Sequence, residues 1–130
     1  MKAKKTTEDY LKIIYVLSQS QEVHACMIAD RLGVSRPTVS VSLKRLAKEG
    51  YLTIDARNVI TLTQKGLETA KPVFARYQIL QRFLVSLGVN EDAAYHDACE
   101  MEHGLGDESY EALKALAGKR EQEERNRNAK

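Results

Sequence analysis

The chain has 130 residues, of which 43% are hydrophobic and 29% charged, and it carries a net charge of +2. A chain of this length forms one compact unit or two small ones and leaves no room for a catalytic domain of ordinary size. No apolar run approaches the roughly 20 residues that span a bilayer, and no export signal follows the basic N-terminus. We therefore expect a cytoplasmic protein without a membrane segment, in which the two cysteines are reduced thiols.

Charge is unevenly distributed along the chain. Residues 1–65 carry 11 Lys and Arg against 6 Asp and Glu, a net +5, whereas residues 66–117 carry 4 against 9, a net −5. Residues 118–130 carry 5 against 3. A basic first half suits a polyanion such as nucleic acid, and an acidic second half suits cations. Solvated faces of unequal charge would give the same distribution, so motifs have to decide between the two interpretations.

The first half of the chain predicts three helices followed by a hairpin. Apolar residues recur at helical spacing in three segments, and two β-prone runs come after them. The expected elements are helices over residues 7–18, 25–32 and 36–49 and strands over residues 51–54 and 59–62. Gly33 ends the second helix, and Ser35 is the expected N-cap of the third, with Pro37 in its first turn. This order of elements is that of a winged helix.

The second half predicts helices alone. Thr63 is the expected cap of a long helix that Gly88 ends, and helices over 91–103 and from about 107 to Gly118 follow. The long helix carries an apolar seam at alternating steps of four and three residues, formed by Val73, Tyr77, Leu80, Leu84 and Leu87. This seam is wider than the first half can cover, so we expect a neighbouring helix or a second subunit to bury part of it.

Residues 28–40 have the pattern of a helix-turn-helix. Ala29 is small where two helices cross, Gly33 serves the turn, and Val34 and Val39 are expected to tie the helices together. The side chains expected to contact DNA are Ser35, Arg36, Pro37, Thr38, Ser40, Val41, Lys44 and Arg45 on the third helix and Arg57 at the hairpin tip. Val41 is placed to meet a thymine methyl group. A winged helix that binds only protein is the alternative, and the +5 balance of this half favours DNA.

Cys99, Glu102 and His103 stand at positions i, i+3 and i+4 of a predicted helix. This spacing puts a thiol, a carboxylate and an imidazole on one face, and all three are ligands for transition metals. A buried cysteine beside a surface Glu-His pair would have the same spacing. The spacing alone leaves both interpretations open.

These residues resemble the diphtheria toxin repressor and manganese transport regulator family of iron- and manganese-dependent repressors. The resemblance runs from Thr6-Thr7-Glu8-Asp9-Tyr10-Leu11 through Pro37-Thr38-Val39-Ser40 to Cys99-Glu100-Met101-Glu102-His103. It implies a homodimer that binds a divalent metal between its first helix and its dimerisation helices and then binds a palindromic operator. The chain stops before the SH3-like domain of longer members, so we expect the short, manganese-regulator type.

The resemblance also implies a set of metal ligands. Asp9 matches the family's first-helix ligand, a carboxylate as in the manganese regulators, while Cys99 matches the iron-responsive branch. The expected site is formed by Asp9, Cys99, Glu102 and His103. We expect Mn(II) or Fe(II), with Co(II) and Zn(II) as further possibilities because a thiolate favours softer metals.

Three positions depart from the family pattern. Lys12 stands where the manganese regulators have a glutamate, Tyr77 where the family has a histidine, and Gln81 where iron-type members have a glutamate. A cation repels metal, and neither tyrosine nor glutamine replaces the lost ligand well. We therefore expect one metal ion per subunit rather than two.

The expected fold is mainly α, with an N-terminal winged helix-turn-helix followed by an α-helical dimerisation domain. We assign residues 1–65 to DNA binding and residues 66–118 to dimerisation and metal binding. Residues 119–130 have almost no apolar side chains and are expected to form a charged, disordered tail.

The expected function is that of a metal-responsive repressor of metal-ion homeostasis genes, with DNA and a second copy of the chain as partners. Two alternatives remain open: a repressor without metal control, which Lys12 and Tyr77 favour, and a redox switch at the Cys99 thiol. An enzyme is not expected, because the chain has no phosphate-binding glycine loop and no nucleophile motif.

Overall fold

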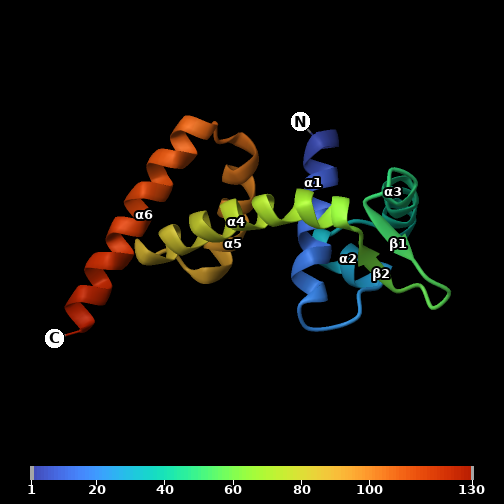
Figure 1. Ribbon diagram of the computed structural model, residues 1–130, viewed down its shortest axis with the longest axis horizontal. Coiled ribbons are helices and arrows are strands. Elements are labelled where there is room, and N and C mark those ends of the chain that lie inside the picture. Colours follow the sequence, from blue (N-terminus) through green and yellow to red (C-terminus); the bar gives the residue numbers. More distant parts are fainter. Residues whose placement is uncertain (1, 130) are drawn as a thin grey trace. The chain divides into compact units, whose positions relative to one another are not determined.

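The structure, a computed structural model, describes the backbone of residues 2–129 and the side chains of residues 7–129. Its elements, shown in Figure 1, are α1 (Lys2–Ser18), α2 (Ala25–Leu32), α3 (Arg36–Lys48), β1 (Leu52–Ile54), β2 (Ile60–Leu62), α4 (Gln64–Ser86), α5 (Glu91–Gly104) and α6 (Asp107–Asn128). This order confirms the predicted fold class, a winged helix-turn-helix followed by helices. The chain divides into two compact units between Phe74 and Ala75, inside α4.

The first unit has one core, formed by α1, α2, α3, the hairpin and the segment between α1 and α2. α1 packs against α2 and β2, while α3 packs against α2 and β1. The buried side chains of this core are Tyr10, Ile13, Ile14, Leu17, Val23, Ile28, Ala29, Val39, Leu43, Leu46, Leu52 and Ile60. α1 begins at Lys2, five residues before the predicted start, because the residues ahead of Thr7 do not interrupt a helix.

The turn between α2 and α3 forms as the sequence predicts. Gly33 has a φ of 68°, in the left-handed region, and the Thr38 backbone N–H donates to the Ser35 side chain at 3.3 Å. Val39 is buried in the core, but Val34 is 38% exposed. The prediction that the Val34 side chain ties the two helices together is therefore wrong. Its backbone serves the turn instead, since its N–H donates to the Ala29 carbonyl.

β1 and β2 form an antiparallel hairpin in which Leu52 pairs with Leu62. The Asp55 carboxylate organises the loop at its tip by accepting the backbone N–H groups of Arg57 at 2.8 Å and Val59 at 3.0 Å. The Val59 N–H lowers the pKa of Asp55 below its ordinary value; desolvation opposes this shift, and the backbone N–H and the charge of Arg57 add to it.

The start of α4 packs closely on the residue that precedes β1. Thr63 caps the helix, as predicted, by accepting the Gly66 backbone N–H at 3.2 Å. A Cβ atom at Gly66 would lie 2.1 Å from the Tyr51 carbonyl oxygen. Glycine is therefore required at this position by the close approach of two backbone segments.

The second unit contains the end of α4 together with α5 and α6. Asn90 caps α5 by accepting the Asp92 N–H at 2.8 Å. α6 continues through Gly118 to Asn128, so the prediction of a helix end near Gly118 with a disordered tail behind it is wrong. The reason is composition: residues 119–127 are mostly Lys, Arg, Glu and Gln, which favour helix even without an apolar face.

Candidate metal centre and nucleic-acid interface

The side chains predicted to contact DNA are exposed on the first unit. They are Ser35, Arg36, Pro37, Thr38, Ser40, Val41, Lys44, Arg45 and Arg57. Ser35 and Thr38 are partly engaged, since their hydroxyl groups lie 2.8 Å apart in a hydrogen bond, and Arg45 pairs with Glu49 at 3.1 Å. Val41, in contrast, is 71% exposed. α3 therefore presents basic and hydroxyl side chains to solvent with an aliphatic side chain among them.

Arg57 at the hairpin tip has a partner that the sequence did not predict. Its Nη2 lies 3.3 Å from Oε1 of Glu22, in the segment between α1 and α2. Glu22 is also 3.9 Å from Nε2 of His24. Both side chains of the Arg57–Glu22 pair are more than half exposed, so the pair holds the guanidinium weakly and leaves it accessible to a phosphate.

The three donors predicted on α5 do not form a surface cluster. The Glu102 side chain is only 4% exposed and that of His103 15%, and the Glu102 Oε1 and His103 Nε2 atoms are 3.6 Å apart. Cys99, one turn earlier, is partly buried and forms no disulfide bond. This burial argues against a surface Glu-His pair, because a carboxylate removed from water requires a positive partner or its own protonation.

The donor chemistry fits a divalent transition metal. Thiolate, carboxylate and imidazole at i, i+3 and i+4 offer three ligands of the types that borderline metals prefer. Asp9, the fourth predicted ligand, lies on α1 in the first unit and is partly buried. Lys12 and Tyr77, the positions that depart from the family pattern, are both buried, and Tyr77 packs edge-on against Tyr95 with ring centroids 5.5 Å apart.

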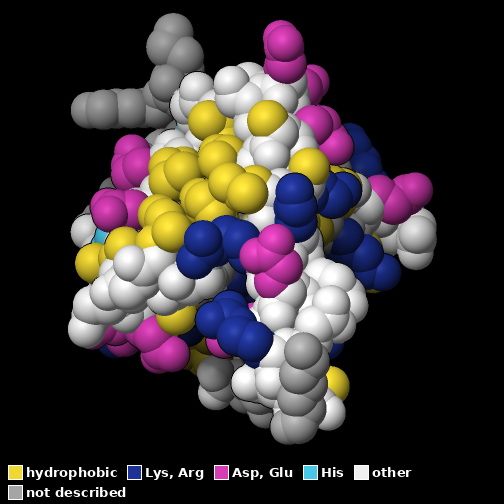
Figure 2. All heavy atoms as spheres, turned by 90° about the vertical axis from the view of Figure 1, so that its left-hand side faces the viewer, with side chains coloured by type: hydrophobic (Ala, Val, Ile, Leu, Met, Phe, Trp, Pro, Cys, Tyr) yellow, Lys and Arg dark blue, Asp and Glu magenta, His cyan; other side chains and the backbone are white. Residues whose placement is uncertain are grey.

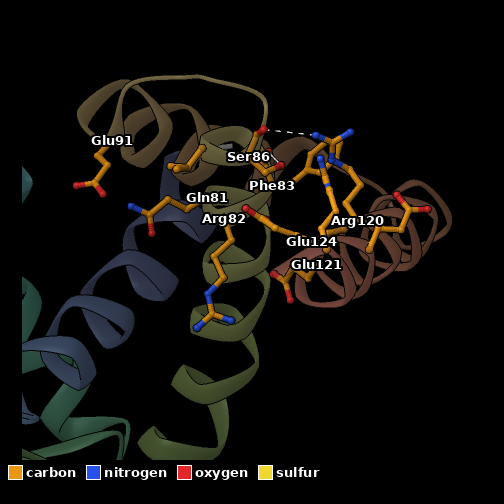
Figure 3. A pocket seen from close by; sticks show the side chains of 12 residues that line it. Gln81, Arg82, Phe83, Ser86, Glu91, Arg120, Glu121 and Glu124 are labelled. Atoms are coloured by element: carbon orange, nitrogen blue, oxygen red, sulfur yellow. Dashed lines mark hydrogen bonds between the residues drawn. The ribbon is translucent and has the colours of Figure 1, made fainter. Parts of the chain in front are cut away.

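A groove of about 720 Å³ separates the end of α4 from α6. Figure 3 shows Phe83 and Ser86 of α4 on one side and Arg120, Glu121 and Glu124 of α6 on the other. Arg120 crosses it to donate to the Ser86 carbonyl at 3.4 Å. The groove is thus lined mainly by charged and polar side chains of both signs, with Phe83, Val85 and Ala117 among them.

Three large hydrophobic side chains of the second unit are exposed, and one of them, Val85, lines this groove. Val85 is 38% exposed, Leu87 53% and Leu116 45%. Figure 2 looks at the side of the molecule on which α6 lies and shows hydrophobic side chains gathered beside Lys and Arg.

No helix within the described residues is long and apolar enough to cross a membrane.

The chain matches two models of one protein family. Residues 2–58 match the iron dependent repressor N-terminal DNA binding domain, and residues 63–128 match the iron dependent repressor metal binding and dimerisation domain. An uncharacterised helix-turn-helix-type transcriptional regulator of Methanocaldococcus jannaschii is 35% identical over 115 residues, which cover 86% of this chain and 92% of that protein. The transcriptional regulator MntR of Salmonella typhimurium is 36% identical over 110 residues, 84% of this chain and 70% of the regulator.

Solved structures show the same relationship. A manganese-dependent transcriptional repressor in complex with manganese superimposes with a TM-score of 0.75 at 33% identity, over 86% of this chain and 52% of that one. The manganese regulator SloR gives 0.72 at 32% identity, over 86% and 53%. The chain spans about half the length of these solved chains. It belongs to the iron-dependent repressor family of metal-responsive, DNA-binding transcriptional regulators.

Proposed function

We propose that this chain represses genes of metal-ion homeostasis in the cytoplasm by binding a palindromic operator as a homodimer when it holds one divalent transition metal per subunit. The observation that carries the proposal is the buried Glu102 carboxylate beside His103, one helical turn from the Cys99 thiol. A transcription regulator needs no catalytic residue, and in this role the three donors bind the metal to which the protein responds.

The metal is held by Asp9, Cys99, Glu102 and His103. A bound ion supplies the positive charge that lets thiolate and carboxylate groups share a site out of water. Because Asp9 belongs to the DNA-binding unit and the other ligands to the second unit, a bound ion restrains one unit relative to the other. The metal then favours DNA binding to the extent that this restrained arrangement fits the operator better than the unrestrained ones.

Mn(II) or Fe(II) is the proposed metal. The regulators named as manganese-dependent among the similar structures support Mn(II). The Cys99 thiolate makes Fe(II) competitive, and also Co(II) and Zn(II), because sulfur ligands favour softer ions.

A second copy of the chain is the proposed occupant of the groove between α4 and α6. Val85, Leu87 and Leu116 expose apolar surface of the kind that symmetric dimers bury, and the matched family model of this region is a dimerisation domain. A two-fold dimer presents two copies of α3, which explains why a palindromic operator is expected. Arg36, Lys44 and Arg57 bind phosphates in this arrangement, and the hydroxyl groups and Val41 contact base edges.

The decisive experiment measures metal content and operator affinity of the anaerobically purified protein. Cys99→Ala and His103→Ala each remove a ligand and are expected to weaken metal binding by more than the roughly 10- to 100-fold typical of outer-shell changes. Cys26→Ala is the matched control, because Cys26 is the second cysteine of the chain and lies exposed on α2. Asp9→Ala is expected to uncouple operator affinity from metal more completely than it removes metal.

The proposal fails if the wild-type protein binds no transition metal, or if operator affinity is the same with metal and with chelator. A response of operator affinity to peroxide that Cys99→Ala abolishes, with no response to metal, would instead establish the redox switch.

A further inference from the structure

The junction between α5 and α6 follows directly after His103 and contains little to hold it in place. It consists of Gly104, the last residue of α5, with Leu105 and Gly106, and the N-cap residue Gly106 makes no side-chain cap bond. A Cβ atom at either glycine would meet nothing within 4 Å, so packing requires neither glycine and both add conformational freedom. The last turn of α5, which carries Glu102 and His103, therefore depends on support from outside the helix.

Arg76 on α4 supplies that support through three contacts. Its Nη2 donates to the Leu105 carbonyl at 3.0 Å, and its Nη1 lies 3.3 Å from the Asp107 carboxylate. The guanidinium carbon stands 4.2 Å from the centre of the Tyr110 ring. The three partners are, in order, the middle of the junction, the first residue of α6 and the first turn of α6. One side chain thus joins the middle of the junction to the start of α6.

The three contacts of Arg76 differ in how far they are protected from water. The Asp107 side chain is fully exposed, so its ion pair with Arg76 is screened by water. Arg76 itself is 23% exposed in its side chain and Tyr110 is buried, so the bond to the Leu105 carbonyl and the stacking on Tyr110 are better protected. Both depend on the planar, forked guanidinium, which a lysine ammonium does not reproduce.

Tyr77, the residue after Arg76, makes a further contact with α5. Tyr77 packs edge-on against Tyr95, two turns before His103, with ring centroids 5.5 Å apart. A single turn of α4 therefore contacts the body of α5 through Tyr77 and Leu105, the residue that follows α5, through Arg76. The donors Glu102 and His103 lie between these two points of attachment.

We infer that Arg76 is a positioning residue for the metal site, which holds the end of α5 so that the Glu102 and His103 donors are oriented before metal arrives. The inference rests on the proposed function for its metal. The clamp, by which we mean the contacts of Arg76 with Leu105, Asp107 and Tyr110, lies within the second unit. A preorganised set of donors binds more tightly because less freedom is lost when the ion binds.

Anaerobic titration of the full chain with Mn(II) and with Co(II) tests this inference. Arg76→Ala is expected to weaken affinity by roughly 10- to 100-fold, as outer-shell changes commonly do, with the stoichiometry unchanged because no ligand is lost. Arg76→Lys retains charge and stem and is expected to weaken affinity less; it also guards against a variant that fails to fold. Lys71→Ala removes a positive charge from an exposed position on the same helix and is the matched control, with wild-type affinity expected.

Hydrogen exchange of the metal-free protein gives a second readout. The Leu105 amide donates to the Met101 carbonyl at 2.8 Å and is expected to exchange faster in both Arg76 variants, while the Ile60 amide of the hairpin keeps its wild-type rate. Wild-type affinity in Arg76→Ala would overturn the role of Arg76 and leave the proposed function intact. A wild-type protein that binds neither metal would overturn the proposed function, even if the exchange result established the clamp.

Discussion

The two units bury different kinds of side chain. The first unit packs aliphatic and aromatic residues from three helices and a hairpin into one core. The buried hydrophobic residues of the second unit are Tyr77, Leu80, Ala94, Ala98, Tyr110 and Ala117, half of them alanine, while large aliphatic side chains stay exposed. Each unit also exposes three large hydrophobic side chains, Val34, Val41 and Ile54 in the first and Val85, Leu87 and Leu116 in the second. The contrast therefore lies in what is buried: the first unit has a core of large side chains, and the second buries alanines and tyrosines together with the Glu102 carboxylate.

Substitution of one glycine in each unit tests this contrast with the largest expected effect. Gly66→Ala would place a Cβ atom 2.1 Å from a backbone oxygen, so α4 has to move away from Tyr51. We expect a loss of more than about 3 kcal/mol in the free energy of unfolding, measured by urea denaturation.

Gly118→Ala is the counterpart in the second unit. A Cβ atom there meets nothing within 4 Å, and the residue lies inside α6. Because alanine favours helix over glycine, we expect a gain of about 0.5–1 kcal/mol. Equal effects of the two substitutions would contradict the difference in packing between the units.

The local elements could be predicted because their determinants are close together in sequence. Ser35 caps α3 through Thr38, three residues away, and the hairpin closes on Asp55 within four residues. The need for glycine at position 66 could not be predicted, since it arises from Tyr51, which no spacing rule connects to it. The helical state of residues 119–128 does not follow from apolar spacing, because a segment rich in good helix formers is helical even without an apolar face.

The candidate site likewise contains residues that local spacing predicts and residues that it does not. Cys99, Glu102 and His103 follow from helical spacing alone, but Asp9 could be suggested only by the family resemblance. The contacts of Arg57 with Glu22 and of Arg76 with Leu105 join residues 35 and 29 positions apart. Such pairs depend on the packing of whole elements, and no local pattern in a single sequence predicts them.

A charge in the exposed apolar surface of the second unit sharpens the contrast further. Leu116→Glu would bury two carboxylates in a symmetric dimer, one from each copy. We expect self-association to weaken by about 2 kcal/mol or more, as at an interface hot spot, measured by sedimentation across a concentration series. Val41→Glu charges an equally aliphatic but more exposed position of the first unit and should leave sedimentation unchanged. A Leu116→Glu protein that sediments like the wild type would place the interface elsewhere.

The exposed valine of the first unit has its own expected role in reading DNA. If Val41 contacts a thymine methyl group, replacement of thymine by deoxyuridine at that operator position removes the contact, at a cost of about 1 kcal/mol or less because only one methyl group is lost. In the Val41→Ala protein the same replacement should have little effect. Titrations of both proteins against both operators measure this coupling, and equal sensitivity in the two would exclude the contact.

The smallest effect concerns the exposed tip of the hairpin. The pKa of Asp55 is lowered mainly by the Val59 backbone N–H and then by the backbone and charge of Arg57. A lowered pKa means that the carboxylate stabilises the folded chain above the ordinary pKa of aspartate, near 4, and that this stabilisation is lost as pH falls through the lower, folded value. Asn at position 55 keeps an oxygen acceptor and removes the charge. Asp55→Asn should therefore melt slightly below the wild type at pH 7, with the gap closing as the pH is lowered towards 3. A melting difference that stays constant from pH 7 to pH 3 would show that the charge of Asp55 does not stabilise the loop.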